Sequence, residues 1–174
     1  MTLNNQEWLN QVIEEPIDPG RQICDPHHHL FICRPNTEAN YFQSKFASEI
    51  SNSGHNIVST IYIECKAMYR NDGPDELKPV GEVEFANGQA AMAASGLYGE
   101  TKICAGIIGY ADLRLGAAVG EVLDAELAAA GDRFRGIRFA GTWNPDPKIR
   151  NGSNNPTDNQ FQETLFREGF GELR

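Results

Sequence analysis

Three consecutive histidines are the residues of this chain whose types and spacing best fit chemistry. They lie in the segment ICDPHHHLF, residues 23–31. If residues 21–25 form a strand, side-chain alternation places His27 and His29 on one face, at or just past the strand's carboxyl end. Residues two apart on a strand are separated by roughly 6.5–7 Å. Both rings can then tilt onto one cation at metal–nitrogen distances of about 2 Å, which makes the pair a candidate for metal ligation.

The neighbours of this pair have different predicted roles. Alternation puts Asp25 on the same face as the pair, and Pro26 and His28 on the other, where His28 packs or forms hydrogen bonds. Pro26 cannot donate a hydrogen bond, so regular strand pairing should fail near it. A catalytic zinc site needs about three protein ligands. The remaining histidine, His55, leads into a later strand and therefore lies at the wrong end to join the pair.

Other chemically useful side chains follow predicted strands. Glu64 closes IYIEC, Asp112 follows IIGYA, and Arg138 lies in GIRFAG. For the two carboxylates, a helix cap or a salt bridge to a neighbour is an equally good interpretation. Arginine suits bidentate recognition of a substrate carboxylate, and the alternative is an internal ion pair with one of those carboxylates. Tyr69 lies in a long loop, where it could contact a substrate.

The elements that must position these residues alternate along the chain. Strands are predicted at 21–25, 56–65, 101–113 and 134–141, and helices at 6–15, 39–50, 83–98, 116–131 and from about 157, capped by Thr157 or Asp158. This alternation predicts a parallel sheet wrapped by helices, preceded by a helical leader within residues 1–20. The long loops, 66–80 and 142–156, both follow strands, at the edge where α/β folds build their sites.

Composition excludes several classes of function. The chain has 174 residues and a formal net charge of −9. Phosphate recognition needs basic clusters, so we expect no nucleic-acid partner, and the charge also disfavours an anionic membrane surface. There is neither a basic, apolar secretory start nor an apolar run of about 20 residues, so we expect a cytoplasmic protein. The four cysteines, Cys24, Cys33, Cys65 and Cys104, form no CxxC and are predicted to be small buried apolar side chains.

Taken together, these segments resemble the amidohydrolase-related family of metal-dependent TIM-barrel hydrolases, in the branch of lactonases and carboxymuconate-semialdehyde decarboxylases. The resemblance rests on DPHHHLF, TIYIEC, CAGIIGYADLRLG and FRGIRFAGTWNPD, and covers most of residues 8–174. It implies one divalent metal ion, often zinc, bound by His27 and His29. In metal-independent relatives the same histidines would bind substrate. The resemblance also implies that Arg138 handles a substrate carboxylate, while Glu64 and Asp112 match strand-end positions.

From the residues and the resemblance together, we predict sites and a fold class. The candidate catalytic residues are Glu64 and Arg138, and the candidate substrate-binding residues are Asp112, Tyr69 and Arg138. A complete (β/α)8 barrel needs about 250 residues, so the fold class is α/β, a TIM-barrel type truncated to about four βα units. Residues 1–174 would form one partial domain, the N-terminal half of a barrel that lacks the family's later histidine and aspartate. It is expected to be a fragment, or a half-barrel that a second copy closes into a homodimer.

Three functions remain open. The first is a hydrolase acting on a lactone or similar carboxylated small molecule, incomplete in this chain. The second is a non-catalytic metal-binding or assembly half-barrel. The third, an open α/β domain that binds a nucleotide, is disfavoured because no GxGxxG or GxxxxGK[ST] follows a strand.

Overall fold

A four-stranded sheet forms the centre of the structure, a computed structural model that describes residues 8, 10–32, 40–152, 154 and 156–173. The strands are β1 (Gln22–His28), β2 (Asn56–Ile63), β3 (Lys102–Gly109) and β4 (Phe134–Ile137). They are hydrogen-bonded in the order β1-β2-β3-β4, which is also their order in the chain, and all three pairs are parallel. The predicted α/β class is confirmed.

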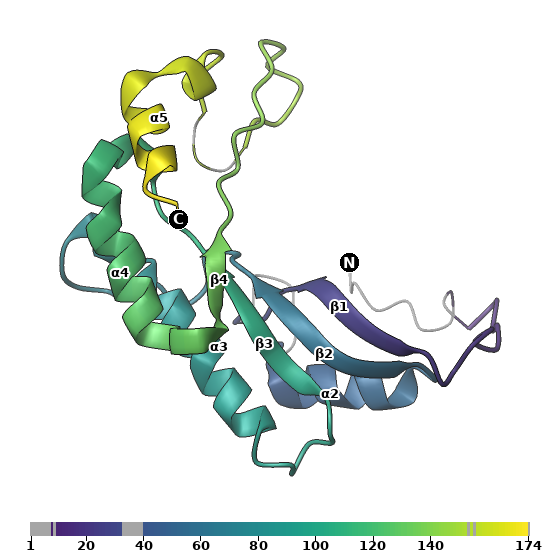
Figure 1. Ribbon diagram of the computed structural model, residues 1–174. Coiled ribbons are helices and arrows are strands. Elements are labelled where there is room, and N and C mark those ends of the chain that lie inside the picture. The colour runs from purple at the N-terminus through teal and green to yellow at the C-terminus, as the bar shows by residue number, and fades with distance from the viewer. Residues whose placement is uncertain (1–7, 9, 33–39, 153, 155, 174) are drawn as a thin grey trace.

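A helix follows each of the four strands along the chain. The helices are α2 (Gln43–Asn52), α3 (Val80–Ala93), α4 (Val119–Ala130) and α5 (Thr164–Gly171), with short 3-10 turns at Asp75–Leu77, Leu113–Ala118, Gly131–Arg133 and Gln160–Gln162. Helices α2, α3 and α4 lie along one face of the sheet, and α5 packs beside the turn that precedes α4 (Figure 1). Among the described residues, no helix covers the opposite face.

The main core lies between the sheet and these helices. Tyr62 and Ile107 project from β2 and β3 and meet Phe46 of α2 and Val83 of α3 in one buried cluster. Strands of a parallel sheet covered by helices are rich in β-branched and apolar residues, which is the pattern that predicted β2 and β3. A second cluster joins α4 to α5 and comprises Ala111, Leu113, Val119, Val122 and Phe166.

Within the predicted N-terminal helix at 6–15, Trp8 is helical, but the prediction is wrong over residues 10–15, which form a turn followed by irregular chain. Residues 6, 7 and 9 lie outside the described residues. The apolar side chains that suggested this helix are not buried, since Val12 is 72% exposed and Ile13 is 80% exposed. A helix this short is marginal without a surface to pack on. Helical spacing of apolar residues was therefore not enough to predict a helix over 10–15.

The C-terminal helix also begins later than predicted. Helix α5 starts at Thr164 with Glu163 in the N-cap position, and no side chain caps it. The Thr157 hydroxyl, one of the two predicted caps, instead donates to the Glu163 carboxylate at 2.6 Å. A 3-10 turn intervenes at Gln160–Gln162, so the chain changes direction between the predicted and the observed start.

The cysteines are only partly as predicted. Cys104 is buried, Cys65 is partly buried and Cys24 is exposed. Cys33 lies outside the described residues. The prediction of burial is therefore wrong for Cys24. Cys24 pairs with Ser59, which precedes the buried Thr60 and so points to the sheet face that no described helix covers.

Candidate functional site

The end of β1 departs from regular pairing, as Pro26 predicted. Asp25 lies opposite Thr60 of β2, and His28 lies opposite Tyr62, so three steps along β1 match two along β2. Residues paired across a parallel ladder share a face, and Thr60 and Tyr62 are two apart and both fully buried. Asp25 therefore lies on the face of His28, and the prediction that it shares a face with the other two histidines is wrong.

His28 packs in the core, as predicted. Its ring stacks on Phe46 with centroids 4.5 Å apart, and it is 7% exposed. Its Nε2 lies 3.6 Å from the sulfur of Cys104. Burial lowers the pKa of His28 to about 4, against the smaller raising effect of Asp25. His28 is therefore a neutral core residue near neutral pH.

His27 and His29 converge. Their Nε2 atoms are 3.2 Å apart, and the rings meet edge to face with centroids 4.9 Å apart. The Nδ1 atom of His29 lies 2.8 Å from the carbonyl oxygen of Ile63, at the end of β2. A carbonyl oxygen only accepts, so Nδ1–H donates and Nε2 carries a lone pair. The ring of His29 is thereby fixed with its lone pair toward His27.

Electrostatics keep His29 neutral. Burial lowers its pKa most, and the nearby Arg138 and His27 lower it further, while the bond to Ile63 and the charge of Glu64 act in the opposite direction. The net shift is downward, which favours the unprotonated imidazole that a metal ligand must be. Hydrogen bonding of the non-ligating nitrogen to a backbone carbonyl is also how metal-binding histidines are oriented.

This pair fits two positions of a metal site. Two nitrogens at about 2.05 Å from a tetrahedral ion are about 3.3 Å apart. This is close to the 3.2 Å between the Nε2 atoms of His27 and His29. The same geometry also allows His27 Nε2–H to donate to His29 Nε2 with no ion between them. Within the described part of the chain, no group of three or more His, Cys, Asp or Glu side chains is placed to hold a metal ion.

Glu64 and Arg138 form an ion pair beside His29. Arg138 Nε donates to Glu64 Oε1 at 2.7 Å, and Nη2 donates to the backbone carbonyl of Glu64 at 2.5 Å. Glu64 is 4% exposed as a residue, whereas the Arg138 side chain is 39% exposed. The backbone N–H of Arg138 donates to the carbonyl oxygen of Gly109 at 2.9 Å. This bond extends the β3–β4 ladder and fixes the position of the Arg138 backbone.

Asp112 is engaged by its own neighbour instead. It accepts from the backbone of Arg114 at 3.0 Å and from its guanidinium at 2.8 and 2.7 Å. Burial would raise the pKa of Asp112, but these bonds to Arg114 outweigh it and the pKa is lowered. The helix cap and the salt bridge considered for this residue are both present. In the described residues no hydrogen bond joins Asp112 to Glu64 or Arg138.

Tyr69 turns its hydroxyl inward. The oxygen is buried and has no hydrogen-bond partner among the described residues. Burial raises its pKa, and the charges of Glu82, Glu64 and Glu126 raise it further. Tyr69 therefore lies close to Glu64 and to two buried glutamates that the sequence analysis did not single out.

Those two glutamates come from the helices. Glu82 of α3 is 1% exposed and Glu126 of α4 is 0% exposed. Each accepts from a backbone N–H just past a strand: Glu82 from Cys65 at 2.7 Å and Glu126 from Tyr110 at 3.3 Å. A signal existed for Glu126, because it stands four residues after Val122, on the buried stripe of its helix.

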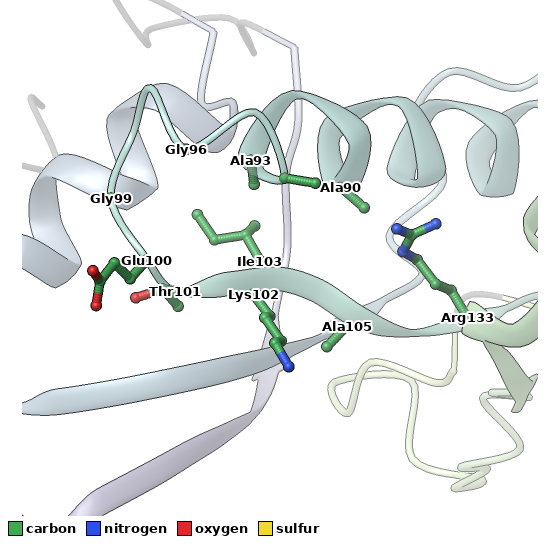
Figure 2. A pocket seen from close by; sticks show the side chains of 11 residues that line it. Ala90, Ala93, Gly96, Gly99, Glu100, Thr101, Lys102, Ile103, Ala105 and Arg133 are labelled. Carbon is green, nitrogen blue, oxygen red and sulfur yellow. The ribbon is translucent and has the colours of Figure 1, made fainter.

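Two hollows lie at the other end of the sheet. One, of about 730 Å3, borders the start of β3, and a second, of about 610 Å3, lies beside it. Small residues such as Ala90 and Ala93 line the first, and its charged groups do not converge, since Lys102 and Arg133 point to opposite sides of β3 (Figure 2). His55 lines the second, at the end opposite the histidine pair, as predicted.

No protein-family model, no curated protein sequence and no solved structure matches this chain. In the part of the chain that the structure describes, no helix is both long enough and apolar enough to span a membrane.

Proposed function

We propose that this chain is part of a metal-dependent hydrolase of the amidohydrolase-related type, acting on a lactone or a similar carboxylated small molecule. The observation that carries the proposal is the convergence of His27 and His29, with the His29 ring oriented by the Ile63 carbonyl. Zn²⁺ is the proposed ion, because neutral imidazole is among its common ligands and the pair has a tetrahedral spacing.

The groups around the pair would have separate roles. A bound divalent ion would supply Lewis acidity to an ester carbonyl or to a water molecule. Arg138 would bind a substrate carboxylate through Nη1, since its Nε and Nη2 are already held by Glu64. Glu64 would hold that guanidinium and accept a proton during hydrolysis. Tyr69 and Asp112 are proposed to contact substrate.

The site would be completed by further strands. The sheet has two open edges and one face without helices among the described residues, and four parallel strands are half the number in a (β/α)8 barrel. We propose that four more strands close the barrel and supply the remaining ligands. They would come from further chain or from a second copy of this one, which would bring a second histidine pair into a shared interior.

Titration calorimetry with ZnCl2 tests the metal part. We expect wild-type chain to bind Zn²⁺, and His27→Ala and His29→Ala each to weaken binding by about 100-fold or more, the upper end of what loss of an outer-shell partner costs or beyond it. His55→Ala is the matched control, a histidine at the far end of the sheet, and should bind as the wild type does. Equal binding by all four proteins would refute the site.

Lactone hydrolysis tests the proposed activity and the need for further strands. We expect the chain alone to hydrolyse lactones weakly or not at all, because two imidazoles do not complete a catalytic site. Fast turnover by a chain shown by light scattering to be monomeric would contradict the need for further strands.

A second candidate function is a non-catalytic metal-binding or assembly module. It is favoured by the two unpaired edges of the four-stranded sheet, where a second copy could pair. Zinc binding that persists with no turnover in a closed barrel would select this function over hydrolysis.

A further inference from the structure

The peptide group between Glu64 and Cys65 is held at both ends. Its carbonyl oxygen accepts from Arg138 Nη2 at 2.5 Å, and its N–H, on Cys65, donates to Glu82 Oε1 at 2.7 Å. In a planar trans peptide the C=O and N–H point in opposite directions. A rotation of this peptide that breaks one bond therefore breaks the other.

Glu82 holds more than this one group. The same Oε1 atom also accepts from the Tyr62 hydroxyl at 2.8 Å and from the N–H of Ala67 at 3.1 Å. Its second oxygen has no hydrogen-bond partner among the described residues. Burial raises the pKa of Glu82, while the bonds from Cys65, Tyr62 and Ala67 lower it. One buried atom thus fixes the chain on both sides of residue 66.

The segment fixed in this way is strained. Lys66 has φ 64° and Met68 has φ 53°, in the left-handed region that side chains other than glycine adopt at a cost. Such a backbone persists only where its surroundings determine it. The first turn of α3 does so, since a Cβ on Gly81 would lie 2.5 Å from the carbonyl oxygen of Met68.

We propose that Glu82 is a positioning residue of the candidate site. It orients the Glu64–Cys65 peptide so that the carbonyl oxygen and the carboxylate of Glu64 both accept hydrogen bonds from Arg138 beside His29. Only the chemistry that this arrangement serves rests on the proposed function. The placement itself follows from the hydrogen bonds described. Glu82 touches neither Arg138 nor the histidine pair in any bond described, and acts through the backbone.

Gln89 provides a control on the same helix. Its side chain is buried, with the residue 8% exposed, and its Oε1 also accepts from a backbone N–H, that of Gln43 at 3.0 Å. Gln43 is the first residue of α2, so Gln89 does not hold the Glu64–Cys65 peptide. Removing either side chain leaves a cavity, but only the loss of Glu82 should disturb Arg138.

The test measures hydrogen–deuterium exchange of the Arg138 Nε–H by NMR, with the signal assigned by loss in Arg138→Lys. Glu82→Ala should speed exchange by about tenfold or more, because the bond that orients the Glu64–Cys65 peptide is lost, whereas Gln89→Ala should change it by less than about twofold. Glu82→Gln keeps a carbonyl acceptor and should restore exchange to within about threefold of wild type.

Equal acceleration by Glu82→Ala and Gln89→Ala would overturn the proposal, since lost packing alone predicts it. No rescue by Glu82→Gln would also overturn it, since glutamine keeps the acceptor that the proposal requires. If Glu82→Ala does not fold, Glu82→Asp replaces it, one methylene too short to reach Cys65, with the same expectation. ZnCl2 affinity of the same variants is a second readout. Failure of wild type to bind Zn²⁺ would refute the proposed function but leave the exchange comparison decisive for Glu82.

Discussion

The two ends of the sheet differ in how space and polar groups are distributed. At the carboxyl edge, where the strands end, His27, His29, Glu64 and Arg138 converge on a backbone held by buried glutamates. At the amino edge, where the strands begin, there is a hollow of about 730 Å3, but small residues line it and its charges diverge. Convergence of oriented polar groups, rather than the presence of a hollow, is therefore the better guide to a site in this molecule.

The largest expected difference is in pH dependence, through Glu126 at the carboxyl edge. Burial raises its pKa from 4.5 to about 8. Between these values the unfolded chain loses a proton that the folded chain keeps, so stability falls as pH rises. The free energy of unfolding should drop by about 3–4 kcal/mol between pH 5 and 8 from this residue.

Urea unfolding at several pH values measures this effect. Glu126→Gln cannot ionise and should remove the drop, while Lys102→Ala, at the amino edge, should keep it. A wild-type profile as flat as that of Glu126→Gln would show that the carboxyl edge is no more pH-sensitive than the rest.

The next effect is the loss of the ion pair. Arg138→Met leaves the Glu64 carboxylate buried without its partner and should lower the free energy of unfolding by about 2–3 kcal/mol, less than for a fully buried pair because Arg138 is partly exposed. The control is Arg21→Met at the amino edge, whose pair with Asp18 has side chains 74% and 51% exposed. It should cost less than about 0.5 kcal/mol. If thermal or urea unfolding shows equal losses of stability for Arg138→Met and Arg21→Met, the two ion pairs contribute alike and the two ends of the sheet do not differ in this respect.

The smallest of these losses of stability is expected at one of two glycines in α3. A Cβ on Gly81 would meet the backbone of Met68 and Arg70 at 2.5 and 2.8 Å, whereas one on Gly88 would meet nothing within 4 Å. Gly81→Ala should destabilise the fold by about 2 kcal/mol, because backbone must move. Gly88→Ala should stabilise it by about 0.5–1 kcal/mol, as alanine favours helix. If Gly81→Ala proves as mild in urea unfolding as Gly88→Ala, the loop after β2 is not tightly packed.

The sequence allowed the sheet and the histidine pair to be predicted because both depend on local pattern. Alternation along β1 brought His27 and His29 together, and β-branched runs marked β2 and β3. The same alternation placed Asp25 on the wrong face of the sheet, because the irregularity beside Pro26 shifts the alternation by one residue. The exact position of that irregularity depends on the pairing of β1 with β2. Glu82 was missed because its role depends on contacts 15–20 residues away, with Ala67, Cys65 and Tyr62.

The strand order β1-β2-β3-β4 bears on how the molecule assembles during synthesis. Each strand pairs with the one made just before it, so no pairing of the sheet has to wait for a strand beyond the next one in the chain. A chain emerging from the ribosome can add one strand–helix unit at a time to an existing edge. The same route leaves the newest edge exposed at each step, where a neighbouring nascent chain could pair with it before the next strand arrives.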